Sequence, residues 1–263
     1  MEESKQNSQP RPFILITNDD GYEAKGINCL VDMLADMADL LVVAPDGPRS
    51  AQSKAITVVT PLRVRKLEER PGLTRYSCNG TPTDCVKIAL YSLVYRKPDL
   101  LLAGINHGSN SSSNVIYSGT VGAVMEGCTE QFPAIAFSLD SHAPDADFEP
   151  CRTVVRKMVD RVLREGLPKR VCLNVNFPVR EHFRGVRVVR QCDGRWMERF
   201  EKHQDPAGHD YYWLTGDFVN FEPDADDTDE WAMRNGYVSV VPCQVDLTHY
   251  GSIQQLKDWN EDE

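Results

Sequence analysis

Short, almost uninterrupted apolar runs recur along this 263-residue chain, separated by segments with helical periodicity. Residues 13–17 (FILIT) form the first run and residues 40–44 (LLVVA) the second. Between them, apolar residues recur from Ile27 to Met37 at the spacing of an amphipathic helix. An apolar run without polar alternation indicates a strand that is buried on both faces. This strand–helix–strand order predicts a parallel sheet with right-handed crossovers.

The same alternation continues to residue 177. In chain order, the patterns predict a helix over 83–95, a strand over 99–103, a helix over 120–130, a strand over 134–137, a helix over 151–165 and a strand over 171–177. Thr81 suits the N-cap of the first of these helices, with Pro82 at its first position and Asp84 in its first turn.

The pattern changes after Pro178. Alternating apolar residues near 186–188 and 211–214, and a run over 236–241, indicate antiparallel strands or hairpins. We therefore expect an α/β fold, a doubly wound and mostly parallel sheet with an irregular C-terminal extension. Its predicted segments are a disordered tail (1–12), the α/β core (13–178) and the extension (179–263).

The charge balance excludes some classes of function. The chain has 29 Lys and Arg against 39 Asp and Glu, a formal net charge of −10, which argues against a nucleic-acid polymer as partner because such proteins need cations to displace phosphate counterions. No apolar run approaches the roughly 18–20 residues that span a bilayer, and the polar N-terminal segment does not resemble a signal peptide. The 8 cysteines stand singly without a C-x-x-C pair, which favours reduced thiols and a cytoplasmic protein.

The loops that leave the strand ends carry the informative polar residues. In open parallel sheets, ligands bind at the carboxyl ends of the strands. The loop over residues 17–22 (TNDDGY) places Asp19 beside Asp20, and adjacent carboxylates repel each other unless a cation lies between them. Carboxylate oxygens are ligands that Mg²⁺ prefers. The alternative interpretation is a simple turn, because Asn, Asp and Gly are common turn residues.

Two further loops offer neutral ligands and an anion site. After the second strand, Arg49 can contact a phosphate and the Ser50 hydroxyl can ligate a metal, although a plain polar loop is the alternative. After the strand over 99–103, the loop over 104–110 (GINHGSN) places Asn106 at the strand end. The candidate phosphate- or substrate-binding residues are Arg49, Gly108, Asn110, Ser118, Gly119 and Thr120.

The segment over 117–122 (YSGTVG) leads into a predicted helix, where free N–H groups and the helix dipole favour an anion. Thr120 also suits a simple N-cap, and the two interpretations are compatible. Neither G-x-G-x-x-G nor G-x-x-x-x-G-K-[ST] occurs in these loops, which argues against a dinucleotide fold and a P-loop NTPase. Together the loops predict an oxygen-ligand metal site beside a phosphate site.

These motifs resemble those of the SurE-type survival-protein nucleotidases, metal-dependent phosphatases of nucleoside monophosphates. The matching stretches are residues 14–21 (ILITNDDG), 42–46 (VVAPD), Arg49 with Ser50, 78–86 (CNGTPTDCV), 104–110 (GINHGSN), 117–123 (YSGTVGA), 173–178 (LNVNFP), 211–213 (YYW) and 236–240 (GYVSV). The resemblance spans nearly everything from Phe13 to about Tyr250.

The resemblance implies a Rossmann-like core and a C-terminal segment that is exchanged between the subunits of a homodimer, sometimes paired into a tetramer. It also implies one divalent metal ion, Mg²⁺ or Mn²⁺, held by Asp19, Asp20, Ser50 and Asn106. Two stretches depart from the family pattern. Residues 47–51 (GPRSA) replace Arg-Asn-Arg-Ser-Gly, and residues 111–114 (SSSN) replace a stretch with glycine and aspartate, which bears on substrate preference.

The expected reaction is hydrolysis of a nucleoside 5′-monophosphate, or a 3′-monophosphate, to nucleoside and phosphate. Asp19, Asp20 and Asn106 are the expected catalytic residues, with one aspartate also orienting or deprotonating the attacking water. His107 is either an acid for the leaving group or a structural residue. An aspartyl-phosphate mechanism is disfavoured, because such enzymes use aspartates separated by one residue. The alternative from another class is a non-catalytic nucleotide-binding stress protein.

Overall fold

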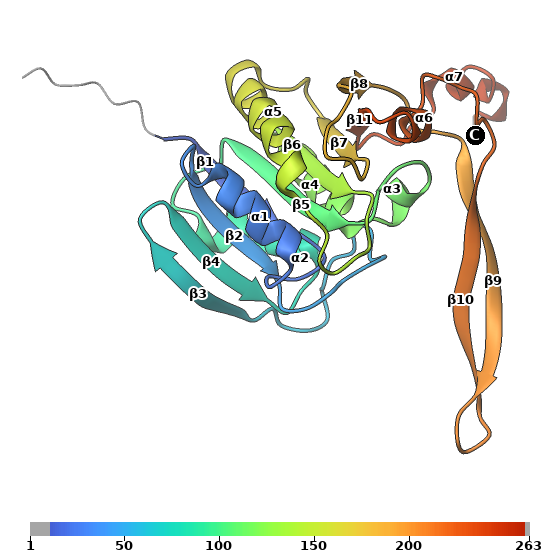
Figure 1. The fold of residues 1–263 in the computed structure, drawn as a ribbon, viewed down its shortest axis with the longest axis horizontal. Coiled ribbons are helices and arrows are strands. Elements are labelled where there is room, and N and C mark those ends of the chain that lie inside the picture. The colour runs from blue at the N-terminus through green and yellow to red at the C-terminus, as the bar shows by residue number, and fades with distance from the viewer. Residues whose placement is uncertain (1–10, 261–263) are drawn as a thin grey trace, which may run out of the picture.

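A nine-stranded sheet organises the chain, whose computed structural model describes residues 11–260 (Figure 1). The strands lie in the order β3-β4-β2-β1-β5-β6-β7-β11-β8. The six central strands are parallel: β4 Leu73–Cys78, β2 Asp39–Pro45, β1 Phe13–Thr17, β5 Leu100–His107, β6 Ala134–Leu139 and β7 Val171–Phe177. The chain winds outward from β1 on one side and from β5 on the other. The predicted doubly wound, mostly parallel α/β fold is confirmed, with its switch point between β1 and β5.

The outer strands complete the sheet at both edges. On one side β3 (Val64–Arg70) pairs antiparallel with β4. On the other, β11 (Val238–Gln244) pairs antiparallel with β7, and β8 (Val186–Val188) pairs parallel with β11. The sequence patterns did not predict β3 or β4. The edge strand β3 has no buried residue, so it carries none of the apolar pattern of a core strand.

Helices cover both faces of the sheet (Figure 1). One face carries α1 (Lys25–Leu34) and α5 (Arg152–Glu165), the latter preceded by η2 (Glu149–Cys151). The other carries α2 (Pro82–Ile88), the π-helical turn η1 (Ala89–Leu93) and α4 (Gly119–Thr129), which the short α3 (Asn114–Tyr117) precedes.

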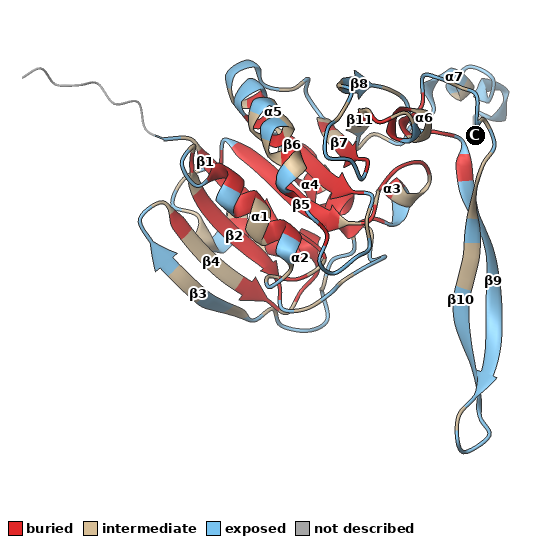
Figure 2. Cartoon of the chain, viewed as in Figure 1, coloured by how far each residue is buried: buried red, intermediate tan, exposed pale blue. Residues whose placement is uncertain are grey.

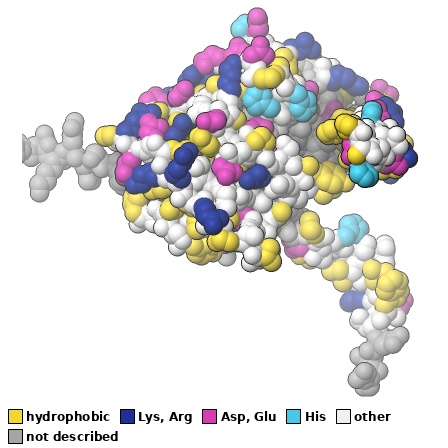
Figure 3. Space-filling model, turned by 90° about the horizontal axis from the view of Figure 1, so that it is seen from below, with side chains coloured by type: hydrophobic (Ala, Val, Ile, Leu, Met, Phe, Trp, Pro, Cys, Tyr) yellow, Lys and Arg dark blue, Asp and Glu magenta, His cyan; other side chains and the backbone are white. Residues whose placement is uncertain are grey.

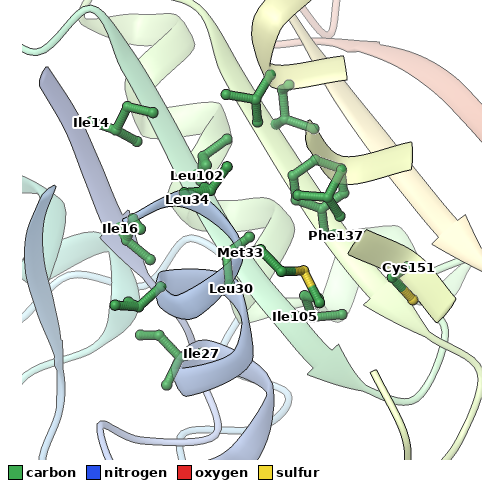
Figure 4. Close-up of a cluster of buried hydrophobic side chains, with 14 of the residues drawn as sticks. Ile14, Ile16, Ile27, Leu30, Met33, Leu34, Leu102, Ile105, Phe137 and Cys151 are labelled. Carbon is green, nitrogen blue, oxygen red and sulfur yellow. The ribbon is translucent and has the colours of Figure 1, made fainter. Parts of the chain in front are cut away.

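The fully apolar strands fill two cores, one on each face. Because side chains alternate along a strand, Ile14 and Ile16 of β1 pack with Ile27 and Leu30 of α1, as Figure 4 shows. Leu15 points to the opposite face and packs with residues of α2 and α4. Burial on both faces explains the absence of polar alternation in the sequence.

Local capping chemistry sets the start of α2. The Thr81 hydroxyl accepts from the N–H of Asp84, whose carboxylate accepts from the N–H of Thr81, and Pro82 begins the helix. The predicted N-cap is confirmed. The predicted single helix over 83–95 is instead α2 followed by the π-helical turn η1.

The C-terminal extension divides into two parts. Besides β8 and β11, it contains a long hairpin of β9 (Gly194–Gln204) and β10 (Asp210–Asn220) that stands out from the body and is largely exposed (Figure 2). The remaining helices are α6 (Asp229–Arg234), α7 (Tyr250–Ile253) and η3 (Lys257–Trp259).

The predicted disordered tail, residues 1–12, falls mostly outside the described residues. Of its last two residues, Arg11 donates to the carbonyl oxygens of Ala35 and Ala38, and the Pro12 carbonyl accepts from the N–H of Asp39. Among residues 11–260, no helix is long and apolar enough to cross a membrane.

Candidate active site

A cleft of about 510 Å³ opens beside the carboxyl ends of the central strands. Its wall includes Asp19, Asp20, Ser50 and Asn106, the four predicted metal ligands. Asp19 and Asp20 follow β1 and Ser50 follows β2, whereas Asn106 lies within the last residues of β5, which extends to His107 instead of ending at the predicted residue 103. These three strands are neighbours in the sheet. Because the strand order reverses between β1 and β5, the loops diverge there and leave space for a ligand. The fold therefore gathers the predicted ligands at its switch point.

Asp19 is the buried acid of the cleft, with 5% of its surface exposed. One carboxylate oxygen accepts a hydrogen bond from the Thr120 hydroxyl at the start of α4. Burial raises the pKa of Asp19 to about 6, against the opposing effect of the Thr120 hydrogen bond. Gly119 makes this approach possible, because a Cβ there would lie 2.9 Å from Asp19 Cβ. A buried carboxylate of this kind favours a cation beside it.

Asp20 and Asn106 approach from opposite sides of the β1–β5 boundary. The Asp20 carboxylate accepts from the backbone N–H of His107 at 3.2 Å, and burial raises the pKa of Asp20. The register of β5 against β6 shifts between Ala103 and Asn106, an irregularity that re-aims the side chains at the strand end. The Asn106 amide nitrogen donates to the Gly108 carbonyl at 2.8 Å. The amide oxygen of Asn106 is thereby directed away from Gly108, within 3.4 Å of the Thr120 hydroxyl.

The donor chemistry of the cleft fits a hard divalent cation. Two carboxylates, the Asn106 amide oxygen and the Ser50 hydroxyl offer oxygen ligands only, as Mg²⁺ and Mn²⁺ favour. Between residues 11 and 260, no group of three or more His, Cys, Asp and Glu side chains is arranged to hold a metal. The two carboxylates balance the two positive charges of the ion, and the neutral Asn106 and Ser50 add no further negative charge to oppose an anionic ligand.

Arg49 and Ser50 follow β2, and only the serine lines the cleft. The Arg49 backbone N–H donates to the Asp19 carbonyl at 2.7 Å, so the two loops are joined. The Arg49 guanidinium bonds Asp46 at 2.9 Å and the Asn79 carbonyl at 3.2 Å. The Arg49 side chain, which the sequence predicted to contact phosphate, therefore forms its hydrogen bonds with protein groups next to it.

Thr120 is not the N-cap of α4, so the alternative interpretation of this residue as a simple cap is wrong. Ser118 is the N-cap, since its hydroxyl accepts from the N–H of Val121 at 3.1 Å, and the helix begins at Gly119. Thr120 donates its hydroxyl to Asp19. Among these residues Ser118 lines the cleft. The positive end of α4 faces the acidic loop, where it favours negative charge.

Gly108 and Asn110 shape the loop after β5. Gly108 has φ +102, and a Cβ there would lie 2.2 Å from the His142 ring, so the position requires glycine. Asn110 donates its N–H to Asn176 at 2.7 Å and its amide nitrogen to Ser138 at 2.8 Å. Both residues line the cleft, and Asn110 also anchors the loop to the strands beside it.

His107 lies at the edge of the cleft and packs edge-on against Phe148, with ring centroids 4.9 Å apart. Its Nδ1 lies 3.2 Å from the Ala143 carbonyl oxygen. Because a carbonyl oxygen only accepts, Nδ1 carries a hydrogen, and in the neutral ring Nε2 does not. His107 could then donate a proton from Nε2 only in its cationic form.

The cleft also contains residues that no sequence motif marked as candidates. They are Ser109, Asn114, Tyr117, Asp140, His142, Trp196, Phe218 and Glu230. Asp140 and His142 directly follow β6, so the rule of strand ends could have found them. Trp196, Phe218 and Glu230 come from the C-terminal extension, and no local pattern marks them.

Comparison with known proteins gives a consistent result. The model of the family described as "Survival protein SurE" matches residues 14–198. A 5′-nucleotidase SurE of Phocaeicola vulgatus is 50% identical over 250 residues, covering 95% of this chain and 97% of that protein. A 5′-nucleotidase SurE of Flavobacterium psychrophilum is 49% identical over 253 residues, covering 95% and 98%.

The fold agrees with a solved structure. The crystal structure of the SurE protein from Aquifex aeolicus superposes with a TM-score of 0.82 at 38% identity, covering 95% of this chain and all of that one. Sequence motifs, the doubly wound sheet and the two-aspartate cleft therefore agree with the predicted resemblance. The chain belongs to the SurE family.

Proposed function

We propose that this protein is a metal-dependent nucleotidase that hydrolyses nucleoside 5′-monophosphates, and 3′-monophosphates as a second class, to nucleoside and phosphate. The observation that carries the proposal is the convergence of Asp19, Asp20, Ser50 and Asn106 in one cleft of a chain whose relatives are named 5′-nucleotidase SurE. The cleft volume of about 510 Å³ exceeds what a phosphate alone needs and lies in the range of small-molecule sites.

Each ligand has a distinct place in the proposed site. Asp19 and Asp20 hold the ion, Mg²⁺ or Mn²⁺, while Asn106 and Ser50 complete its coordination as neutral donors. When bound, such an ion polarises a phosphoryl oxygen and lowers the pKa of a coordinated water. Asp20 is the more exposed aspartate and orients the attacking water, because Asp19 is engaged by Thr120.

The phosphoryl group is placed at the start of α4. Ser118 lines the cleft there, and the helix dipole stabilises the negative charge that phosphoryl transfer spreads over the equatorial oxygens. Thr120 acts through Asp19, whose carboxylate it holds in position. This arrangement separates a metal end from an anion end within one cleft.

We further propose a homodimer, or a tetramer of paired dimers, formed by exchange of the part of the C-terminal extension that projects from the body, the outer length of the β9–β10 hairpin. A two-stranded hairpin is marginally stable alone, yet the β9–β10 hairpin carries exposed Phe200, Trp213 and Leu214. Figure 3 shows hydrophobic side chains on the parts that stand out from the body. Contact with a second copy would bury this surface. The 8 free cysteines among the described residues further support a reducing compartment such as the cytoplasm.

The test is phosphate release from a panel of 5′- and 3′-nucleotides with Mg²⁺, with Mn²⁺ and with EDTA. We expect turnover with a metal and none with EDTA, and we expect Asp19→Asn to lose activity while it keeps its fold. Nucleotide binding without turnover under every condition would instead favour a non-catalytic nucleotide-binding stress protein. Full activity of Asp19→Asn would exclude the proposed metal site.

A further inference from the structure

The cleft continues beyond its phosphate end to an aromatic wall. Trp196 and Phe218 line the same cleft as Asp19 and Asn106. They are cross-strand partners at the base of the β9–β10 hairpin, with ring centroids 6.2 Å apart and planes at 66°. Tyr117, at the end of α3, lies on the same wall. The hairpin therefore contributes its base to the pocket while its far end projects away from the body.

The Trp196 ring is held in place at its polar edge. Its indole N–H donates to Asn114 Oδ1 at 2.7 Å. Phe218 packs against the ring in an edge-on geometry. The indole N–H is the only polar group of this side chain, so the remaining surface is flat and apolar. Trp196 nevertheless keeps 45% of its surface exposed, which leaves ring area free for a ligand.

The loop after β5 joins this wall to the metal-binding end. The Ser112 hydroxyl lies 3.0 Å from the carbonyl oxygens of both Cys192 and Gly194. The backbone N–H groups of Ser112 and Cys192 donate to the two oxygens of buried Asp229, at 2.8 and 2.9 Å. Ser112 and Asn114 lie in the stretch that departs from the family pattern. In this chain, that stretch fastens the hairpin base to the site.

We propose that Trp196 is the platform on which the nucleobase of the substrate stacks, and that this chain selects purine nucleotides over phosphomonoesters without a base. The proposal rests on the nucleotidase function proposed above. Aromatic side chains bind bases through stacking, and a purine offers more ring area than a pyrimidine. The inferred subsite is a face of the cleft, continuous with the phosphate end.

The dimensions of the cleft suit this arrangement. Asn114 is the first residue of α3 and Ser118 follows its last, four positions later, which is about 6 Å at about 1.5 Å of rise per residue. With the phosphate at Ser118 and the base on Trp196, the sugar lies between them. Glu230 and Asp140 line the cleft as carboxylate acceptors for sugar hydroxyl groups.

Kinetics with two substrates test the platform. AMP has a base to stack, whereas ribose 5-phosphate has only the sugar and phosphate. For Trp196→Ala we expect the ratio of kcat/KM for AMP to that for ribose 5-phosphate to fall at least about tenfold, about 1.4 kcal/mol at 1.4 kcal/mol per factor of ten. Trp196→Phe should keep the ratio within about threefold, and Trp196→Leu, which preserves apolar bulk, should lose it.

Trp213→Ala is the matched control, because Trp213 lies on the same hairpin, is 63% exposed and does not line the cleft. It should leave the ratio unchanged, even if it lowers both activities through the assembly. An unchanged ratio in Trp196→Ala and Trp196→Leu would overturn the proposal.

Binding of adenosine, which has no phosphate, gives a readout that does not require turnover. Equilibrium dialysis should show weaker adenosine binding by Trp196→Leu than by the wild-type protein, and equal binding would overturn the platform. If the wild-type protein hydrolysed neither phosphate ester but bound adenosine through Trp196, the nucleotidase proposal would fail while the platform would stand. The two proposals are thus distinguishable.

Discussion

Replacing Gly119 by alanine should damage the site and leave the fold intact. A Cβ at this position would lie 2.9 Å from Asp19 Cβ and 3.0 Å from Asp19 Oδ2. Carbon atoms pack at about 3.5–4.0 Å, so the two residues would have to separate by about 0.6–1.1 Å. Because Asp19 Cβ is bonded to the backbone, the loop after β1 must move and carry the carboxylate with it.

Opposing effects keep the stability change of Gly119→Ala small. Alanine in a helix is favoured over glycine by up to about 1 kcal/mol, whereas overpacking costs about 1–3 kcal/mol. A net loss of at most about 3 kcal/mol lowers Tm by no more than about 12 °C in a chain of this size. A misplacement of about 1 Å in a positioned group costs about 100-fold in rate. We therefore expect kcat/KM to fall roughly 100-fold.

The assay is phosphate release as a function of Mg²⁺ or Mn²⁺ concentration, together with calorimetric melting. Gly119→Ala should need more metal for half-maximal activity. Gly127→Ala is the control on the same helix, because its Cβ would lie 2.7 Å from Leu101 Cδ2 and 3.2 Å from Ala134 Cβ, inside the core. It should lower Tm while it keeps the metal requirement. Wild-type activity and metal dependence in Gly119→Ala would show that the site does not depend on the close approach of Gly119 to Asp19.

Three further predictions concern pH, phosphate contact and assembly. Burial raises the pKa of Asp19 to about 6, so the folded, metal-free protein keeps a proton that the unfolded chain loses near pH 4. As the pH rises from about 4 to about 7, the free energy of unfolding measured in EDTA should therefore fall by roughly 3 kcal/mol. In urea unfolding, the free energy of unfolding of Asp19→Asn should depend less on pH than that of the wild-type protein. An equal pH dependence in the two proteins would argue against Asp19 as its cause. Arg49→Ala should change KM less than about threefold, because its guanidinium bonds Asp46 and backbone carbonyls; a tenfold rise in KM would show that it reaches the substrate. Trp213→Glu combined with Leu214→Glu should give a monomer by light scattering, and an unchanged assembly mass would contradict exchange through the hairpin.

The central strands could be predicted from the sequence because burial on both faces leaves uninterrupted apolar runs. β1 and β2 are of this kind. The edge strand β3 (VRKLEER) lacks such a run, because it is charged and largely solvent-facing. Local patterns also could not show that β11 pairs with β7. The pairing places Ser239 opposite Asn176, and these residues are far apart in the sequence.

The convergence of polar residues in the cleft could be predicted because topology brings strand ends together. That rule found Asp19, Asp20 and Asn106 without reference to side-chain orientation. It could not show that Arg49 turns toward Asp46, since this depends on rotamers and on neighbouring carbonyl groups. The aromatic wall was also beyond sequence reasoning, because the extension reaches the cleft only through tertiary contacts.

The two ends of the β9–β10 hairpin have different surroundings and are therefore subject to different selection. Its base at Trp196 is tied to the loop after β5 through Asn114, whereas exposed residues such as Trp213 lie farther along the ribbon. Substitutions near the base would be selected by the substrates available to the cell. Substitutions farther out would be selected by the fit between subunits. Homologues could therefore change nucleotide preference and quaternary structure independently, within a single ribbon that runs from Gly194 to Asn220.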